Sequence, residues 1–166
     1  MNKSKIIIVN KNDKIINHKE RETLAQSDIY RVSVLWIQNP KGDILLAQRS
    51  FNKKKNPGKW GPAVAGTNDE GESYESNIIK EAEEELGLKN IKIKKLFHKL
   101  AEDKRRRFFQ WFITIIDKEI FEFTIQKEEV EKIKWFTKEE LLKELNKFPN
   151  KFLNSKIKEC MDYLNE

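Results

Sequence analysis

The spacing of apolar and polar residues along this 166-residue chain predicts short strands interrupted by helices. Turn residues at 10–13 (Asn-Lys-Asn-Asp) and 39–42 (Asn-Pro-Lys-Gly) each separate two strand-like segments, so two hairpins are expected. The expected strands are 6–9, 14–16, 31–38, 43–49, 60–65, 91–100, 108–116, 122–124 and 133–136. The expected helices are 73–86, 138–145 and 155–164.

The central helix, residues 73–86, has the clearest local signals. Ser73 is a suitable N-cap, and Gly87 stands where a left-handed residue commonly ends a helix. Its apolar positions share one face and are Ile78, Ile79, Ala82 and Leu86. We therefore expect one side of this helix to pack on a core and the next side to border a cleft.

The order of the elements indicates an α+β fold in a single domain, 1–166. Within it, we expect an N-terminal hairpin and lead-in at 1–27, a core at 28–150 and a C-terminal helix at 151–166. No repeat or linker interrupts the chain, and its length suits one hydrophobic core.

Three carboxylates share the polar face of the central helix. Glu81, Glu84 and Glu85 are related by i, i+3 and i+4 spacing, which gathers them within an arc of roughly 100°. Each like-charge pair costs about 0.2–0.5 kcal/mol on an exposed helix and more beside a cleft. A divalent ion would remove this repulsion, and oxygen donors without thiol or imidazole favour Mg2+, with Mn2+ as the alternative.

A run of glutamates alone would be weak support, because charged residues make up 36% of the chain and such runs are usually solvated. The frame around them is specific: Gly66, five residues, Glu72, seven residues, then Lys80-Glu81-Ala82-x-Glu84-Glu85-x-Gly87-Leu88. Residues 66–88 thus resemble the Nudix box. Two positions depart from that pattern, Lys80 for arginine and Ala82 for a bulkier aliphatic residue.

The resemblance covers nearly the whole domain. Residues 31–34, 42–49 and 56–60 look like the strands that precede a Nudix box, and 128–136 look like the segment that follows it. The family fold, an α/β/α sandwich around a mixed β-sheet, is therefore expected. The arrangement of 31–60 is most similar to the branch with type 1 isopentenyl diphosphate isomerase and its hydrolase relatives.

The resemblance implies a Mg2+-dependent hydrolase that cleaves the diphosphate linkage in a nucleoside diphosphate linked to another group. Metal binding and catalysis are implied for Glu81, Glu84 and Glu85, with Gly66 at the metal and Glu129 as a further catalytic carboxylate ahead of its close second, Glu128. The general base stays open among Glu81, Glu129 and Glu102. Glu72 and Lys80 are expected to support the site as a pair, and the substrate-binding candidates are Arg31, Arg49 and Lys59.

Two alternatives remain beside the hydrolase. Isomerase chemistry is disfavoured because residues 60–64 contain neither the cysteine nor the histidine that it needs. A non-catalytic nucleotide-binding module would keep the fold without turnover, and Lys80 is its only support, since lysine lacks the planar fork of arginine.

The net charge of +6 is expected to be spread largely over the surface, because lysine is abundant throughout the chain, but two clusters stand out: Lys53-Lys54-Lys55 with Lys59, and Arg105-Arg106-Arg107. Either cluster suits substrate phosphates, and residues 50–59 and 99–107 are the expected specificity segments. Neither is interleaved with aromatic residues as nucleic-acid surfaces are, so we expect a small-molecule diphosphate as partner and no nucleic acid.

The remaining composition points to a cytoplasmic protein. Ile6 to Val9 is too short for a signal sequence or a membrane span, so no membrane partner is expected. Cys160 is the one cysteine, which excludes an intrachain disulfide, and with only His18 and His98 beside it a zinc site is not expected. Cys160 is expected to be buried in a helix. A homodimer through the N-terminal hairpin is a further expectation.

Overall fold

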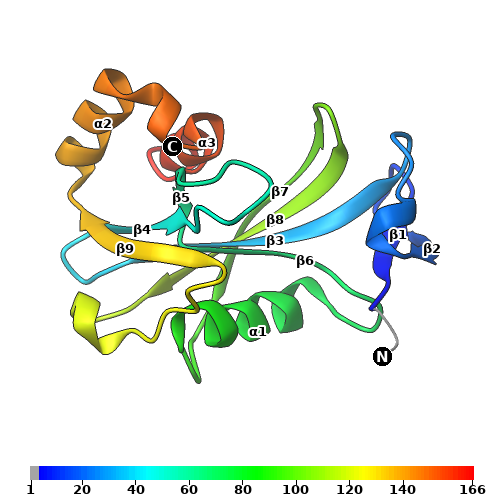
Figure 1. Cartoon of the computed structure of the whole chain (residues 1–166), viewed down its shortest axis with the longest axis horizontal. Helices are drawn as coiled ribbons and strands as arrows, with labels where there is room; N and C mark the ends of the chain where they lie inside the picture. Colours follow the sequence, from blue (N-terminus) through cyan, green and yellow to red (C-terminus); the bar gives the residue numbers. More distant parts are fainter. Residues whose placement is uncertain (1–3) are drawn as a thin grey trace.

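A mixed β-sheet runs through the middle of the molecule, and helices cover both of its faces (Figure 1). The structure is a computed structural model, and it describes residues 4–166; residues 1–3, the start of the expected segment 1–27, lie outside the described residues. The strands are β1 (Ile6–Val9), β2 (Ile15–Lys19), β3 (Ile29–Gln38), β4 (Ile44–Arg49), β5 (Trp60–Pro62), β6 (Val64–Thr67), β7 (Lys94–Glu102), β8 (Arg106–Ile115) and β9 (Val130–Phe136). The helices are α1 (Tyr74–Leu86), α2 (Lys138–Lys147) and α3 (Asn154–Tyr163), with short 3-10 turns η1 (Arg21–Thr23), η2 (Ile120–Glu122) and η3 (Pro149–Lys151).

The long strand β3 organises the sheet. β8 runs parallel to it from Tyr30 to Gln38. Three antiparallel partners follow one another along the other edge of β3: β1 at 29–30, β6 at 32–35 and β4 at 37–38. β9 and β5 then pair with β4, and β7 pairs with β8. This arrangement brings β6, which leads into α1, to the centre of the sheet.

Alternate residues of β3 enter two separate cores. Leu35 and Ile37 pack in the core below the sheet in Figure 1, whose other members include residues of α1, Ile78, Ala82 and Leu86. Val34 and Trp36 pack in the core above it, together with residues of α2 and α3, among them Leu141, Leu145 and Ile157. Burial of both faces stabilises the sheet between two helical layers. The expected α/β/α sandwich in an α+β fold is confirmed.

The central helix has the expected bounds. Ser73 precedes it, and its side chain accepts a hydrogen bond from the Ser76 backbone while the Ser76 hydroxyl accepts one from the Ser73 backbone, which forms a capping box. Gly87 ends the helix in the left-handed conformation, at φ 67°. Both caps lie beside the segments that build the candidate site.

The strand expected at 122–124 is wrong. Its first residue, Glu122, lies in η2, and the chain beyond it turns its backbone toward the end of α1. The amides of Thr124 and Gln126 donate to the carbonyls of Leu86 and Glu85, at 3.2 and 2.9 Å. The backbone groups of this segment therefore complete the C-terminal turn of α1 and are not available to a strand ladder.

The other differences concern register and extent. The second expected hairpin is formed only next to its turn, since β3 and β4 pair at two positions. Beyond them, β6 pairs with the same edge of β3 and β5 pairs with the same edge of β4. The segment 60–65 is divided into β5 and β6. β7 begins at Lys94 instead of residue 91, and it continues with β8 into a hairpin whose turn is 103–105.

The burial predicted for Cys160 is confirmed, because it lies in α3 with no exposed surface. Trp36 of β3 is also buried in the core, at 1% exposed. No helix in residues 4–166 combines the length and the apolar character that a membrane crossing requires.

Candidate active site

The acidic face of α1 meets strand β6 at Gly66. A Cβ atom at Gly66 would lie 2.5 Å from Cγ and 2.7 Å from Oε1 of Glu81, so any side chain there would displace the Glu81 carboxylate. Glycine at this position lets the backbone of β6 approach the carboxylate directly. The structure thus brings two of the expected metal-binding residues, Gly66 and Glu81, into contact.

Glu81 and Glu85 on this face are protonated more readily than free glutamates. Burial, together with the charges of Glu84, Glu72 and Glu129, raises the pKa of Glu81 to about 7 although Lys80 acts in the opposite direction. Burial and the charges of Glu81 and Glu129 raise the pKa of Glu85 to about 8. Negative charge is therefore concentrated where it is poorly solvated, as expected of a site that holds a cation.

Glu129 reaches this group from the turn before β9. Its charge acts on both Glu81 and Glu85, whereas Glu128 is an exposed neighbour, which supports the choice of Glu129. The backbone of this turn is tied to the loop after β4, because the amide of Ser50 donates to the carbonyl of Glu129 at 2.9 Å. Lys53, from the same loop, forms an ion pair with the Glu129 carboxylate.

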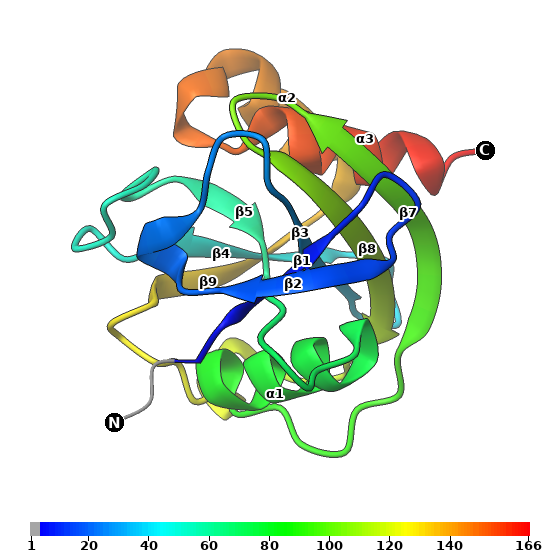
Figure 2. The same ribbon diagram turned by 90° about the vertical axis from the view of Figure 1, so that its right-hand side faces the viewer.

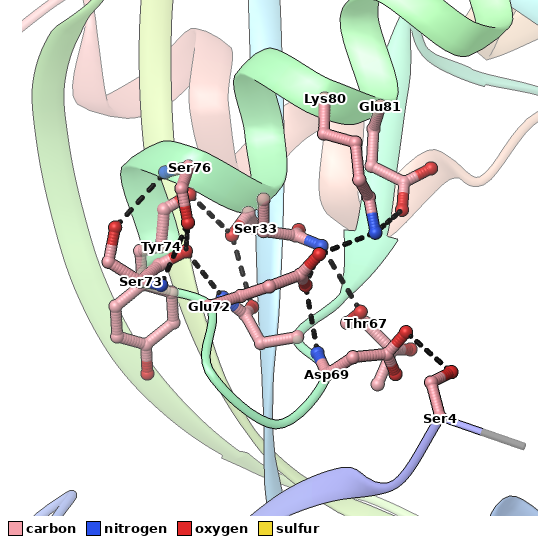
Figure 3. A network of polar contacts seen from close by, with 12 residues as sticks. Ser4, Ser33, Thr67, Asp69, Glu72, Ser73, Tyr74, Ser76, Lys80 and Glu81 are labelled. Carbon is pink, nitrogen blue, oxygen red and sulfur yellow. Dashed lines mark hydrogen bonds and ion pairs between the residues drawn. The ribbon is translucent and has the colours of Figure 1, made fainter. Parts of the chain in front are cut away.

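Glu72 and Lys80 form the expected pair, and Figure 3 shows the network around them. One oxygen of Glu72 accepts from Lys80, and the other accepts from the Asp69 amide at 2.9 Å and from Nδ2 of Asn77 at 2.8 Å. The Lys80 ammonium also lies 3.7 Å from Oε1 of Glu81. Lys80 therefore connects the loop before α1 to the carboxylate at Gly66.

The donor set fits a hard divalent cation. The four carboxylates offer only oxygen ligands, and the absence of a side chain at Gly66 lets the Glu81 carboxylate lie against the backbone of β6. Within residues 4–166, no three acidic, histidine or cysteine side chains already surround a single point. A bound ion would draw together carboxylates that now repel one another, and Glu81, Glu84, Glu85 and Glu129 are the residues that would hold it.

The substrate-binding candidates differ in their surroundings. Arg49 lies at the end of β4, where its charge acts on Glu85 and its Nε donates to the Lys55 carbonyl at 3.0 Å. Lys59 lies opposite Arg49, whose amide donates to the Lys59 carbonyl at 2.9 Å. Both residues therefore border the loop that carries Lys53.

Arg31 is engaged elsewhere. Its Nε donates to Oδ1 of Asp13 at 2.7 Å and its Nη2 donates to the Asp13 carbonyl at 2.6 Å. The hydroxyl of Tyr74 donates to the other carboxylate oxygen at 2.9 Å, and His98 lies 3.1 Å from it. This cluster ties the turn of the N-terminal hairpin to β3 and to the start of α1.

Sequence reasoning did not find the partners of Arg31 or the particular role of Lys53. Asp13 was read only as a turn residue, and its φ of 57° agrees with that reading, but the residues that it joins are distant in the chain. Lys53 was one of three adjacent lysines, and the pattern did not distinguish it. Glu102, one candidate for the general base, pairs with Arg106 in the β7–β8 hairpin and is not among the main charges that shift Glu81 or Glu85.

Comparison of this chain with known proteins identifies its family. The model of the NUDIX domain matches residues 29–155. An uncharacterised Nudix hydrolase of Listeria monocytogenes is 34% identical over 125 residues, which cover 75% of this chain and 73% of that protein. The crystal structure of a Deinococcus radiodurans protein superposes with a TM-score of 0.75 at 21% identity, over 87% of this chain and 90% of that one, which shows the same fold.

The narrower branch has less support. An isopentenyl-diphosphate delta-isomerase of Citrobacter koseri is 42% identical, but over 53 residues that cover 32% of this chain and 29% of that enzyme. The family model and the Listeria relative each extend over most of the chain, and the range of the family model includes the glutamates of α1, the glycine of β6 and the turn that carries Glu129. The chain therefore belongs to the Nudix family, and it is a pyrophosphohydrolase of that family.

Proposed function

We propose that this enzyme is a Mg2+-dependent hydrolase of the diphosphate linkage in a nucleoside diphosphate joined to another group, with water attacking phosphorus. One observation carries the proposal: Glu81, Glu84 and Glu85 of α1 share their electrostatic field with Glu129 from a distant turn, and the Glu81 carboxylate lies against the backbone at Gly66. Such a concentration of oxygen donors suits a metal-bound diphosphate.

When bound at these carboxylates, Mg2+ would neutralise phosphate charge and lower the pKa of a coordinated water. The side chains of this protein supply the remaining functions. Lys80 holds Glu81 in orientation through its contacts with Glu72 and Glu81. Arg49 and Lys59 border the site and are proposed to bind substrate phosphates, with Arg49 able to offer two parallel hydrogen bonds.

The structure narrows the proposed roles of two other candidates. Arg31 is bound by Asp13, so we propose that it fixes the N-terminal hairpin against the sheet and does not contact the substrate. Glu81 and Glu129 stay the candidates for the general base, because Glu102 is paired with Arg106 outside the acidic group. A base must reach the proton that it removes, and only the first two share the site.

The residues of the site support neither alternative. Isomerase chemistry lacks a suitable thiol, since Cys160 lies in α3 in the core on the far face of the sheet and burial raises the pKa of its thiol. The only argument for a non-catalytic module is that Lys80 replaces the arginine of the family pattern. Lys80 nevertheless contacts both Glu72 and Glu81, so we propose that it orients these carboxylates as the arginine would.

A panel of nucleoside diphosphates joined to sugars, alcohols or a second nucleotide tests the proposal. Products should form only with Mg2+ or Mn2+ present, and reaction in isotopically labelled water should place the label in a phosphate product. Glu84→Gln should lower kcat/KM by about 100-fold or more. Glu83→Gln is the matched control, because Glu83 is the adjacent glutamate, about half exposed and paired with Lys89. Saturable nucleotide binding without any product would contradict the hydrolase assignment.

We also propose a cytoplasmic setting and a small-molecule substrate. The homodimer expected through the N-terminal hairpin stays a prediction. Sedimentation of the purified protein would test it, and a monomer at all concentrations would contradict it.

A further inference from the structure

An exposed phenylalanine lies next to the acidic site. Phe51 follows the end of β4 by two residues, and it is 64% exposed. Single exposed apolar residues are ordinary in proteins, so exposure alone indicates no function. Two further observations distinguish Phe51: its ring rests on a glycine backbone, and its neighbours in the chain bind the turn that carries Glu129.

The ring of Phe51 packs against the backbone at Gly58. A Cβ atom at Gly58 would lie 2.5 Å from Cε1 and 3.0 Å from Cδ1 of that ring, so any side chain there would displace it. Gly58 also has a φ of 68°, in the left-handed region that favours glycine. The ring is therefore supported by the chain at one place while most of its surface stays open to solvent.

Hydrogen bonds close the base of the loop that carries Phe51. The Gly58 amide donates to the Arg49 carbonyl at 3.1 Å, and the Arg49 amide donates to the Lys59 carbonyl at 2.9 Å. Nε2 of Gln48 donates to the Gly58 carbonyl at 2.8 Å. Because the loop is already ordered, a ligand that binds the ring would lose little free energy to ordering it.

A short turn places Phe51 beside Glu129. The Lys53 amide donates to the Ser50 carbonyl at 3.2 Å, so residues 50–53 form a turn with Phe51 in its second position. The Ser50 amide donates to the Glu129 carbonyl at 2.9 Å, and the Lys53 side chain pairs with the Glu129 carboxylate. Both ends of the turn therefore contact a residue that is proposed to hold the metal.

Further hydrogen bonds connect Glu129 to the end of α1. The Glu129 amide donates to the Gln126 carbonyl at 3.0 Å, and the Gln126 amide donates to the Glu85 carbonyl at 2.9 Å. Figure 2 shows the loop after β4 and the loop that leads into β9 on the same side of the molecule. A nucleotide whose phosphates lie at these carboxylates is long enough to reach the ring of Phe51 with its base.

We propose that Phe51 is the surface on which the nucleobase of the substrate stacks while the phosphates lie at the carboxylates. This inference deepens the proposed function and rests on it for its kinetic consequence. An exposed aromatic ring suits this role because every base presents a flat π-face, so stacking favours nucleosides without selecting one base strongly. Binding of a base to the ring can be measured without turnover.

The binding experiment compares adenosine 5′-monophosphate (AMP) with ribose 5-phosphate, which carries the same phosphate and lacks the base. Neither ligand contains a diphosphate, so both can be titrated by calorimetry with Mg2+ present. The wild-type protein should bind AMP about tenfold more tightly than ribose 5-phosphate, in line with the contribution of one stacked base. F51A should bind AMP only as tightly as the wild type binds ribose 5-phosphate.

Three other variants separate stacking from other effects. F51W keeps an aromatic surface and should retain the preference for AMP, whereas F51L keeps an apolar side chain without a π-face and should lose most of it. F121A is the matched control, because Phe121 is 84% exposed in η2, outside the loop after β4. If F51A does not fold, F51L and F51W decide the proposal.

Several outcomes would overturn the stacking role. These are no binding of AMP by the wild type, equal affinity of the wild type for AMP and ribose 5-phosphate, and a preference for AMP that F51A retains. A preference that F51L keeps in full would also overturn it, since apolar contact alone would then explain the binding.

The kinetic experiment uses a nucleoside diphosphate substrate from the panel described above. F51A should raise KM about tenfold and leave kcat within about twofold, since a base remote from the cleaved bond is bound equally in the ground state and the transition state. A loss of kcat with unchanged KM would overturn the stacking role, because Phe51 would then act through the position of Glu129. Failure to hydrolyse any diphosphate would contradict the hydrolase function, and AMP binding would then decide the role of Phe51 alone.

Discussion

Glu72 and Glu85 are glutamates of the same box at opposite ends of α1, yet their acidities shift in opposite directions. Burial alone would raise the pKa of Glu72, but hydrogen bonds from Lys80, the Asp69 amide and Asn77 lower it. Burial raises the pKa of Glu85 to about 8, and Glu81 and Glu129 add to that effect more strongly than Lys53 and Arg49 oppose it.

The difference shows how this protein separates scaffold from site. The Glu72 carboxylate has donors for both oxygens, so it holds the loop before α1 in place. The charges of Glu81 and Glu129 act on Glu85 and are only partly offset by Lys53 and Arg49, so we propose that a cation from solution balances the charge of Glu85. Glu72 and Glu85 are the same residue type in the same motif, so their different neighbours decide their different roles.

The largest expected effect follows from removing the carboxylate of Glu85, which has fewer compensating partners than Glu72. Glu85→Gln should lower kcat/KM by about 100-fold or more, because one oxygen ligand of the proposed cation would be lost. The same change should leave the melting temperature unchanged or raise it, since a poorly solvated charge is removed. Kinetics with Mg2+ and thermal unfolding in EDTA measure the two effects. Retained activity together with a lowered melting temperature would reverse the roles assigned to Glu72 and Glu85.

A change at Glu72, whose two carboxylate oxygens accept hydrogen bonds, should affect stability more than activity. Glu72→Gln removes the acceptor of Lys80 and weakens the loop before α1, so the free energy of unfolding should fall by about 1–3 kcal/mol. Activity should fall less than in Glu85→Gln, because Glu72 does not face the cation. Chemical unfolding and kcat/KM test this prediction, and a stability equal to that of the wild type would contradict it.

The two glutamates should also give opposite pH dependences in the metal-free protein. Because the native pKa of Glu85 is raised from 4.5 to about 8, the native state keeps a proton that the unfolded chain has lost, and stability from this group falls as pH rises between about 5 and 8. Glu72 has a lowered pKa, so its contribution is present above the unfolded value of 4.5 and is lost as pH falls below it.

Thermal unfolding in EDTA from pH 4 to pH 8 would measure these slopes. The stability gained by Glu85→Gln relative to the wild type should grow with pH, whereas the deficit of Glu72→Gln should shrink toward pH 4. Subtracting the wild-type curve removes the contribution of other titrating groups. Parallel curves for all three proteins would show that the environments of the two glutamates do not differ.

The smallest effect is expected at Lys80, where the family pattern has arginine. Lys80→Arg keeps the charge near Glu72 and Glu81 and should change kcat/KM by less than about fivefold. Lys80→Met removes both contacts and should lower kcat/KM further. A kcat/KM that rose by orders of magnitude in Lys80→Arg would contradict this prediction and would show that Lys80 weakens the enzyme.

Local patterns in the sequence determined α1 and its chemistry. Ser73, Gly87 and the apolar spacing between them define the helix, and the spacing of Glu81, Glu84 and Glu85 places these carboxylates on one face in any helical conformation. These features depend on residues within a few turns of one another, so they can be read without a fold.

Tertiary structure alone decided which distant residues join that face. Glu129 and Lys53 reach it because β9 pairs with β4, which brings the turn before β9 next to the loop after β4. Arg31 binds Asp13 because β1 of the N-terminal hairpin pairs with β3. The segment 122–124 closes the end of α1 instead of joining the sheet for the same kind of reason. Periodicity describes one element at a time, whereas these contacts depend on how elements pack, and packing is set by the whole chain.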